Sequence, residues 1–579
     1  MSDQKNVILA VVLSFLIIFG FQYFVDTPKV EEQNAQQASE QSASNGSTPS
    51  PNVGTASAPS VSGAVEQTIS REESLKSAPR IAINTPSLHG SISLKGARID
   101  DLSLINYRET VDPSSPEIKL LSPTGSPAPY YADFGWSVSS DAQTKLPNND
   151  TLWQTNSSQL TPDSPLVMTW DNGEGLLFTR TYSLDKNFLF TIDQQVKNTG
   201  TAPVTLFPYG LISRTGLPET TGFYILHEGP IGVFNDTLEE VDYDDLTDEG
   251  SVALDSTGGW IGMTDKFWLA ALLPDQSVNF KGRFNHIADG DRYQTDYLNQ
   301  DGVTIPAGGS ATATNRLYAG AKEVNVLDEY EKDFGISRFE LAIDWGWFYF
   351  LTKPIYFALE FLAEKIGNLG LAILALTVVI KLLLLPLAHK SYVSMSKMKK
   401  LQPEMVKLRE KFSEDKQQLN QEMMALYKRE KANPAAGCLP ILLQVPIFFA
   451  LYKVLFVTLL MRHQPFYGWI TDLSAPDPTT VFNLFGLIPW TPPEFMLIGA
   501  LPLLMGASMF LQQKFNPQPA DPVQAKIFMF MPIFFTFLLA SFPAGLVIYW
   551  TWNNCLSIAQ QWFIMRRMGV SVSGHSTKA

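Results

Sequence analysis

A single lysine lies inside one of the longest apolar runs of the chain. The run is LTVVIKLLLLPL, residues 376–387, and Lys381 is its only charged residue. An ammonium group at membrane depth costs about 2.5–3.5 kcal/mol on insertion scales. In a helix, Lys381 would lie about 9 Å before Leu387. Either the flexible lysine stem carries its charge to the membrane surface, or the protein uses the charge inside.

Polar residues in this run and in later apolar runs favour use inside. They are Thr377, Gln444, Asn554, Ser557 and Gln561. Such groups usually face protein or a water-filled cavity at membrane depth, although each alone is more often a hydrogen bond between helices. The apolar cores of the other runs hold no acidic residue. Lys381 is therefore a candidate receptor for an acidic group of another molecule.

No residue pattern in the sequence predicts an enzyme. The six histidines show no metal-ligand spacing, and no nucleophile motif, P-loop or dinucleotide fingerprint occurs. The acidic stretch 239–250 lacks the glycine that a calcium loop needs at its sixth position. We expect no cofactor and no metal.

Charge divides the 579 residues into two unlike parts. Residues 26–333 hold 42 acidic and 20 basic side chains, whereas the remainder holds 15 and 23, together with the long apolar runs. An acidic soluble part argues against nucleic acid as a partner. The two cysteines, Cys438 and Cys555, both lie in apolar segments, so the acidic part has no disulfide.

The acidic part predicts a β-rich domain over residues 80–335. Phe188, Phe190, Ile192 and Val196 alternate with polar residues, and turn clusters such as LPNND and DNGEG recur at strand-like spacing. A large antiparallel sandwich is the simplest interpretation. Before it, residues 1–26 predict an uncleaved membrane anchor, and residues 27–79 predict a disordered linker.

The remainder predicts a polytopic helical membrane region. Residues 336–353 are rich in aromatic side chains and predict an amphipathic helix at the membrane surface. With the anchor, the apolar runs give six spans, the later five being 354–388, 437–461, 495–512, 527–541 and 544–565. A loop at 462–494, a loop at 513–526 and a tail at 566–579 separate or follow them.

Residues 389–433 predict a mobile helical hairpin. Met398, Leu401, Met405 and Leu408 repeat at coiled-coil spacing, and FSED breaks the pattern before a second arm. An adaptable apolar surface that receives a ligand is one interpretation of the hairpin methionines, and packing between the two arms is the other. The methionines concerned are Met395, Met398, Met405, Met423 and Met424.

Basic residues predict the topology. The hairpin holds eleven Lys and Arg from Lys390 to Lys431 against six acids, which places it in the cytoplasm. If all six spans are real, the loop at 513–526 and both termini also lie in the cytoplasm, and the acidic domain lies outside.

The motifs of the helical region resemble the YidC/Oxa family of membrane protein insertases. The matching segments, in order, are IKLLLLPL, KANPAAGCLPILLQVPIFFALY, the Asp-Leu-Ser at 472–474, LPLLMGASMFLQQKFNP and FMPIFFTFLLASFPAGLVIYW. The match covers about residues 345–567. The anchor and the outer domain resemble the Gram-negative bacterial form.

This resemblance implies a mixed fold in the bacterial inner membrane. It implies six transmembrane helices with a five-helix insertase core, a large periplasmic β-supersandwich akin to sugar mutarotases, and a cytoplasmic hairpin that receives substrate. Lys381 corresponds to the cation of a hydrophilic groove, where many bacterial members have arginine, and Thr377 and Tyr549 correspond to groove and substrate-contact positions. Residues 481–494 are extra length compared with the family.

The resemblance also implies partners. They are nascent membrane proteins, membrane lipids and the Sec translocon with its accessory subunits. The resemblance extends to the ribosome as a partner. Relatives with long basic tails use them there, but the tail here is short and has one lysine, so we do not expect the tail to carry that contact.

Two other functions stay open at this point. A solute transporter would favour inverted repeats and charge pairs between spans, and neither is evident. A membrane-anchored sugar-binding protein would need a cleft in the outer domain with carboxylates and histidines, but it would not need six spans.

Overall fold

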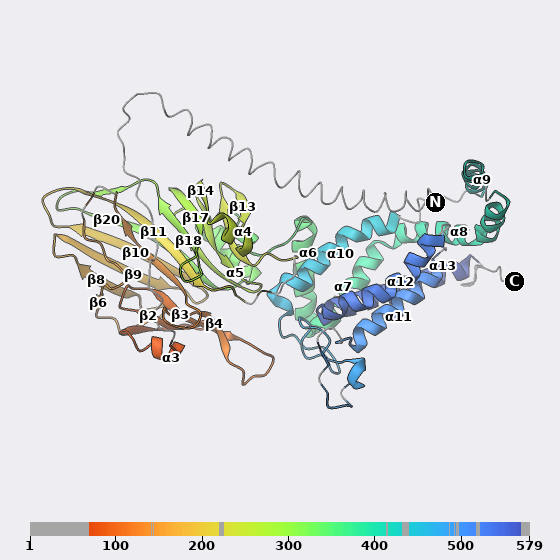
Figure 1. The fold of residues 1–579 in the computed structure, drawn as a ribbon, viewed down its shortest axis with the longest axis horizontal. Coiled ribbons are helices and arrows are strands. Elements are labelled where there is room, and N and C mark those ends of the chain that lie inside the picture. The colour runs from red at the N-terminus through yellow and green to blue at the C-terminus, as the bar shows by residue number, and fades with distance from the viewer. Residues whose placement is uncertain are drawn as a thin grey trace, which may run out of the picture. The chain divides into compact units, whose positions relative to one another are not determined.

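The computed structural model describes residues 69–568, except 140–141, 143, 219, 221–224, 413–414, 431–438, 486, 491, 494–496 and 517–521. The expected anchor, most of the expected linker, Cys438 and the end of the tail lie outside the described residues. Within them, the chain forms a β domain and then a series of helices (Figure 1).

The described strands of the β domain form two sheets. The first sheet consists of β1 (Arg80–Asn84), β2 (Leu88–Ser93), β3 (Ile99–Arg108), β4 (Glu117–Leu121), β5 (Tyr130–Ser137), β7 (Gln159–Leu160), β11 (Val204–Thr215), β14 (Ser251–Thr257), β17 (Asn279–Ile287), β18 (Arg292–Asn299) and β19 (Val303–Ile305). The second consists of β6 (Gln154–Thr155), β8 (Leu166–Asp171), β9 (Leu176–Leu184), β10 (Leu189–Asn198), β12 (Gly229–Phe234), β13 (Thr237–Glu240), β15 (Gly259–Thr264), β16 (Trp268–Leu273) and β20 (Ser310–Ala321). Neighbouring strands pair antiparallel, apart from the parallel pair β1–β7.

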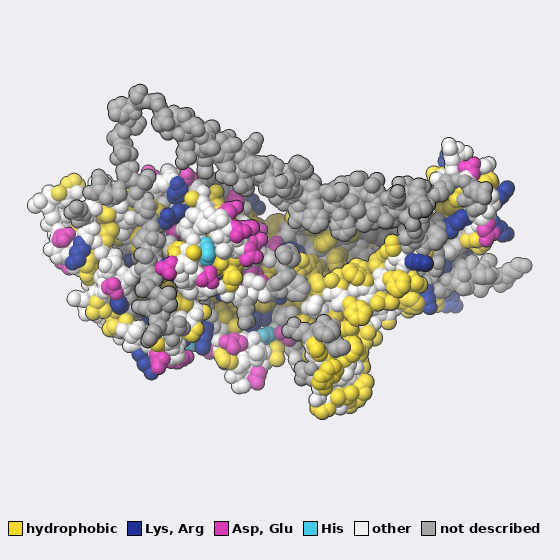
Figure 2. Space-filling model, in the orientation of Figure 1, with side chains coloured by type: hydrophobic (Ala, Val, Ile, Leu, Met, Phe, Trp, Pro, Cys, Tyr) yellow, Lys and Arg dark blue, Asp and Glu magenta, His cyan; other side chains and the backbone are white. Residues whose placement is uncertain are grey.

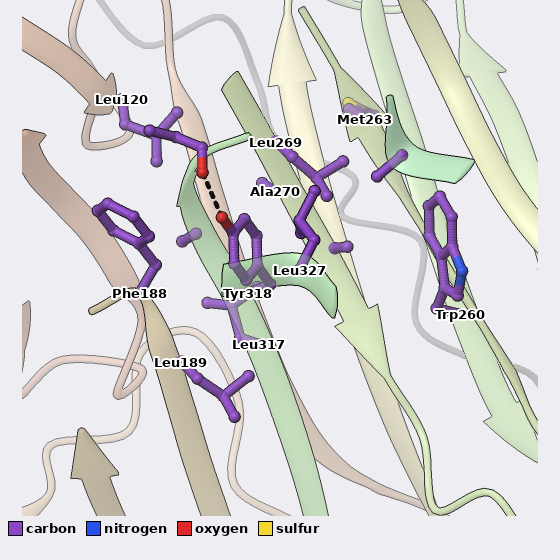
Figure 3. Packing of buried hydrophobic residues seen from close by; sticks show 14 of the residues in the cluster. Leu120, Phe188, Leu189, Trp260, Met263, Leu269, Ala270, Leu317, Tyr318 and Leu327 are labelled. Atoms are coloured by element: carbon purple, nitrogen blue, oxygen red, sulfur yellow. Dashed lines mark hydrogen bonds between the residues drawn. The ribbon is translucent and has the colours of Figure 1, made fainter. Parts of the chain in front are cut away.

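The two sheets pack face to face, as the sequence predicts. Phe190, Ile192 and Val196 of β10 are fully buried, which confirms the alternation. Arg180 of β9 crosses between the sheets and donates to the carbonyl oxygen of Phe134 on β5. Figure 3 shows aromatic and aliphatic side chains of this core, which also includes Leu327 of helix α5 (Val324–Phe334).

The last residues of the expected linker that the structure describes contact the β domain. Helix α3 (Arg71–Ser74) begins with a capping box between Ser70 and Glu73. The Arg71 guanidinium forms an ion pair with Asp101 on β3, and the Ile69 amide donates to the Gly125 carbonyl (2.9 Å). These bonds fix a segment whose composition alone predicts disorder.

Helices make up most of the remaining described chain. They are α4 (Tyr243–Glu249) within the β domain, and then α5 (Val324–Phe334), η1 (Phe339–Ala342), α6 (Tyr349–Ile366), α7 (Leu369–Leu383), α8 (Leu385–Lys411), α9 (Lys416–Arg429), α10 (Leu439–Val457), η3 (Leu459–Met461), η4 (Val481–Asn483), α11 (Ala500–Phe515), α12 (Pro522–Leu538), η6 (Leu539–Ser541) and α13 (Ala544–Arg567).

Residues 336–353 do not form the expected amphipathic helix. The short 3-10 helix η1 ends at Ala342, and α6 begins only at Tyr349. Gly346 adopts a left-handed conformation (φ 70°) and its amide donates to the Asp344 carboxylate (3.0 Å), so the chain turns there. Trp345 is buried and donates from Nε1 to the Glu340 carbonyl (3.0 Å).

The expected span 354–388 is divided at two points. Gly367 is left-handed (φ 74°) and ends α6, and the Asn368 side chain caps α7 by accepting from the Leu371 amide. At Leu384 the axis turns by 69° between α7 and α8. The apolar run continues across the bend at Leu384, so the sequence pattern conceals that break. The first break lies in a polar stretch with Glu364, Lys365, Gly367 and Asn368, which the sequence does mark.

The helical region exposes many large apolar side chains. Among the described residues, no single helix is both long and apolar enough to cross a bilayer. The bent pair α7–α8 meets both conditions when the two helices are counted together. Shorter apolar helices cover Gln444–Val457 and Ala525–Ser541. Hydrophobic side chains crowd the helical region in Figure 2, and charged ones gather on the β domain and around α8 and α9.

Candidate functional site: a polar cavity around Lys381

Lys381 lies one turn from the end of α7, just before the bend. Its ammonium donates to the Ser557 hydroxyl of α13 (2.8 Å). That hydroxyl in turn donates to the Asn553 carbonyl of its own helix (2.8 Å), so its hydrogen is directed away from the cation. Within the described residues, no carboxylate forms an ion pair with Lys381.

A second contact between the same two helices holds this pair in register. The Trp552 indole N–H of α13 donates to the Leu374 carbonyl of α7 (3.2 Å). Both contacts advance in the same direction along the two helices, from Leu374 to Lys381 and from Trp552 to Ser557. Helices α7 and α13 therefore run parallel.

A small cavity of about 20 Å³ lies beside Lys381. Its lining comes from the α7–α8 corner, α10 and α13, and consists of Lys381, Leu384, Leu387, Ala388, Tyr392, Gln444 and Gln560. This volume is enough for about one water molecule. A polypeptide would need the surrounding helices to separate.

Three of the seven predicted groove residues thus come together. Lys381 and Gln444 line the cavity, and Ser557 binds Lys381. Thr377 is buried and donates to the Ile373 carbonyl of its own helix (2.7 Å). The one-turn spacing of Thr377 and Lys381 therefore does not join them in a common polar surface.

The other three predicted residues face elsewhere. Asn554 donates to the Ser508 hydroxyl (2.9 Å), and Gln561 donates to the Asn516 side chain (3.0 Å), so both join α13 to α11 and its end. Tyr549 is buried and stacks on Phe448 with 6.4 Å between ring centroids. These residues hold helices together in the state described.

Helix geometry explains why Ser557 is separated from its predicted partners. Each residue turns the helix by about 100°, so Asn554 and Gln561, seven residues apart, lie within about 20° of each other. Ser557 is about 60° away from Asn554. That rotation is enough to direct Asn554 and Gln561 to α11 and Ser557 to α7.

Two polar residues of the cavity lining are not among the predicted groove residues. Tyr392 lies beyond the bend in α8, and Gln560 lies next to Gln561 on α13. The Gln560 side-chain oxygen is buried without a hydrogen-bond partner in the structure. The adjacent glutamines at 560–561 are a signal in the sequence that could identify Gln560 as well as Gln561.

The base of the hairpin is fastened to two helix ends. Lys399 of α8 is buried and donates to the Lys514 carbonyl at the end of α11 (2.7 Å). The next residue, Lys400, donates to the Met568 carbonyl that follows α13 (2.8 Å). Cations at helix C-termini satisfy free carbonyls and oppose the negative end of the helix dipole. Burial lowers the pKa of Lys399.

The hairpin itself forms as predicted, with arms α8 and α9. Its core of Leu401, Met405 and Leu426 confirms the coiled-coil stripe, and Met398 and Met423 pack against that core. For these three methionines, packing between the arms is therefore the observed role. Met424 is 52% exposed, whereas Met395 is half-buried.

Comparisons with known proteins find relatives that match nearly the whole chain. Residues 80–358 match the family model of the YidC periplasmic domain, and residues 361–571 match that of the 60Kd inner membrane protein. The chain is 52% identical to the membrane protein insertase YidC of Methylobacterium radiotolerans, over 99% of this chain and 96% of that protein. It is 51% identical to the one of Bradyrhizobium diazoefficiens, over 99% and 97%. A crystal structure of an active YidC insertase aligns over 84% of this chain and 92% of that one, at 16% identity and a TM-score of 0.33.

Proposed function

Because the chain belongs to the YidC family of membrane protein insertases, we propose that Lys381 receives the hydrophilic flank of a nascent membrane protein during insertion. The family is one of inner-membrane insertases, and such proteins act on nascent membrane proteins. The proposal concerns which residues of this chain carry that activity.

The observation that carries the proposal is a cation held by a neutral group. Lys381 has a hydroxyl partner and, within the described chain, no carboxylate partner. A charge that is removed from water and left without a counter-ion gains most from an acidic group that arrives from outside. An acidic flank would take the place of the Ser557 contact and of water in the cavity. The following apolar segment would then pass into lipid, with no covalent chemistry and no nucleotide.

The arrangement of basic groups supports the proposed topology. Helices α11 and α13 also run parallel, since Ser508 meets Asn554 and Asn516 meets Gln561. The hairpin base binds the C-terminal ends of both. Those ends carry Lys514, Arg566 and Arg567, which the positive-inside rule assigns to the cytoplasm. We propose that this end is cytoplasmic and that the six expected spans place the β domain in the periplasm.

The hairpin is the proposed receiving surface. Its base is fixed by Lys399 and Lys400, whereas the outer part of its two arms is stabilised mainly by a small core of its own. Met424 is the methionine that presents the most apolar surface to an incoming segment. We further propose that the protein works alone or beside the Sec translocon, as the family resemblance implies. A transporter is disfavoured because Lys381 has no charge partner on any of the other helices that the structure describes.

Site-specific photocrosslinking from the chain to a stalled nascent membrane protein tests the site. Probes at Leu384 and Ala388, which line the cavity, should crosslink to the hydrophilic flank. A probe at Met424 should crosslink to a shorter nascent chain, before the flank reaches the cavity.

The matched control is Phe534 on α12, an apolar residue that is 61% exposed and distant in sequence from the cavity lining. Its probe should react with lipid or with the apolar segment and not with the flank. Crosslinks to the flank from Phe534 as strong as those from Leu384 would contradict the proposed path.

A further inference from the structure

The loop between η4 and α11 carries an unusual concentration of apolar side chains. Residues 478–493 contain no charged residue. Large apolar side chains of this loop are exposed, and we call them the apolar tip: Phe482, Leu484, Phe485, Leu487, Ile488 and Trp490. Leu487 is 83% exposed, the largest value among the tip residues. An ordinary surface loop would present polar groups here.

The tip has a defined backbone. The Phe485 amide donates to the Thr480 carbonyl (2.9 Å), and the Ile488 amide donates to the Asn483 carbonyl (3.0 Å). Leu484 and Phe485 both adopt left-handed conformations, with φ of 52° and 58°. Large residues rarely adopt this conformation, because it brings the Cβ atom close to the backbone. The hydrogen bonds hold the tip in this form although its side chains pack on little else.

The base of the loop is locked to α11. The buried Asp477 carboxylate accepts from the Leu501 amide (2.7 Å) and from the Trp469 indole (3.1 Å). The Thr479 hydroxyl accepts from the Ala500 amide (3.0 Å). A carboxylate at a helix N-terminus also opposes the positive end of the helix dipole. The tip is therefore held at a fixed position relative to α11.

The apolar tip is continuous with the apolar surface of the helices. Leu497, Leu503 and Leu504, at the start of α11 and just before it, are exposed. Further along, exposed apolar side chains continue on α11 and α12, including Phe510 and Phe534. Figure 2 shows hydrophobic side chains gathered at the lower end of the helical region, where charged ones are scarce.

We propose that the apolar tip inserts into the lipid bilayer beside α11 and anchors that helix at a fixed depth. A lipid surface is the occupant that fits, because the tip offers hydrophobic area and almost no hydrogen-bonding side chain. Protein interfaces usually combine apolar contacts with hydrogen bonds and a polar rim. The polar exception, Asn483, donates back to the Trp490 carbonyl of the same loop (3.4 Å). Tryptophan is a residue that favours the membrane boundary.

Spin labelling of the full-length protein in liposomes tests this inference. Cys438 and Cys555 are replaced by serine, and one new cysteine is introduced as Leu487→Cys. The label is exposed in turn to oxygen, which concentrates in the bilayer, and to a water-soluble nickel complex. We expect oxygen to relax the label at 487 more strongly than the nickel complex does. The result does not depend on which leaflet the loop enters, so it is separate from the proposed topology and from the role of Lys381.

Two matched sites calibrate the measurement. Phe534→Cys on α12 reports a lipid-facing position, and Leu152→Cys, an exposed leucine of the β domain (56%), reports water. A label at 487 that behaves like the one at 152 would overturn the proposal. Protection from both reagents, with dipolar broadening between labels, would also overturn it and would identify a second copy of the chain as the occupant.

Discussion

Two lysines of this protein each donate a hydrogen bond to a hydroxyl group, but their surroundings differ. In the β domain, Lys322 donates to the Thr264 hydroxyl at 2.8 Å. In the helical region, Lys381 donates to the Ser557 hydroxyl, also at 2.8 Å. Lys322 is almost completely buried, and carboxylates including Asp265 lie near enough to favour its charge. Lys381 adjoins a cavity and has no carboxylate partner in the described chain.

We propose that this difference distinguishes a lysine that stabilises the fold from a lysine that binds an acidic group of the substrate. Burial lowers the pKa of Lys322 to about 8, and Asp265 and Glu228 limit that shift. Lys322 also lines a cavity, of about 400 Å³, but carboxylates already favour its charge. Among the described residues no carboxylate pairs with Lys381, and an acidic flank of a substrate would supply one.

The largest expected effect follows a reversal of charge at Lys381. Lys381→Glu should reduce insertion of a substrate with an acidic flank by about tenfold or more, because like charges about 4 Å apart repel by about 4 kcal/mol at an effective dielectric of 20. Lys381→Ala should be intermediate, and Lys381→Arg should stay close to the unmodified protein because it keeps the cation. Protease protection of one substrate, made with an acidic and with a neutral flank, measures the yield. Equal yields for both flanks in Lys381→Glu and Lys381→Ala would rule out pairing with the substrate.

Removal of the charge from Lys322 should not impair the protein and should keep or raise its stability. Lys322→Met keeps the volume and removes a desolvated ammonium, so it should leave the free energy of unfolding unchanged or raise it by about 1–4 kcal/mol. The lowered pKa means that the unfolded chain binds more protons between about pH 8 and 10.5. The β domain should therefore gain stability across that range, and Lys322→Met should lose this gain.

Urea unfolding at pH 7.5 and pH 10, followed by hydrogen exchange of β20 amides, measures both effects. Insertion should be unaffected in this variant. A loss of insertion in Lys322→Met as large as that in Lys381→Glu would remove the distinction between the two lysines.

A smaller effect is expected when the hydroxyl that each lysine binds is removed, and it tests the same difference between Lys322 and Lys381. Thr264→Val should cost about 1–3 kcal/mol, because it leaves a fully buried ammonium without its acceptor. Ser557→Ala should change stability less, because water can bind Lys381 from the cavity. Thermal unfolding of each domain, followed by hydrogen exchange, compares the two variants. Equal losses would show that the cavity at Lys381 is as closed as the site of Lys322.

The sequence identifies the cation beside the cavity better than it predicts the groups around it. Lys381 stands out because the residues beside it are apolar, and Ser557 and Gln444 were identified with it. Asn554 and Gln561 were assigned to the same site because polar residues at membrane depth look alike in sequence. Only the packing of α13 between α7 and α11 decides which neighbour each one meets.

Other features depend on contacts that composition does not encode. Lys399 is one of many lysines in the hairpin sequence, and its role at the end of α11 requires the folded arrangement. The turn at Leu384 lies in a continuous apolar run, so no change in pattern marks it. In the β domain, by contrast, the alternation at Phe190, Ile192 and Val196 predicted a buried strand correctly. In a sandwich, every second residue of a strand faces the core, so the burial of the strand is visible in its sequence.

The smallest expected effect comes from an ion pair of the β domain, His227 with Asp242, in which the histidine is buried and the carboxylate is exposed. His227 donates from Nε2 to the Pro230 carbonyl (2.9 Å), and its Nδ1 lies 3.3 Å from the Asp242 carboxylate. Burial opposes protonation of the ring, but the hydrogen bond with Asp242 and nearby acidic groups raise the pKa of His227 overall. The same hydrogen bond lowers the pKa of Asp242.

The sign of the pH dependence follows from these two shifts. The His227 contribution is complete below its unfolded pKa of about 6.5 and is lost as the pH rises through the folded value. The Asp242 contribution is complete above about pH 3.9 and is lost as the pH falls through its lowered value. Because the Asp242 carboxylate is largely exposed, the pair should contribute about 0.2–1 kcal/mol. Asp242→Asn should therefore destabilise the β domain more at pH 5 than at pH 8.5, as measured by urea unfolding, whereas Lys322→Met should act in the alkaline range. A deficit of Asp242→Asn that is larger at pH 8.5 would assign the acid-range stability to other groups and contradict this ion pair.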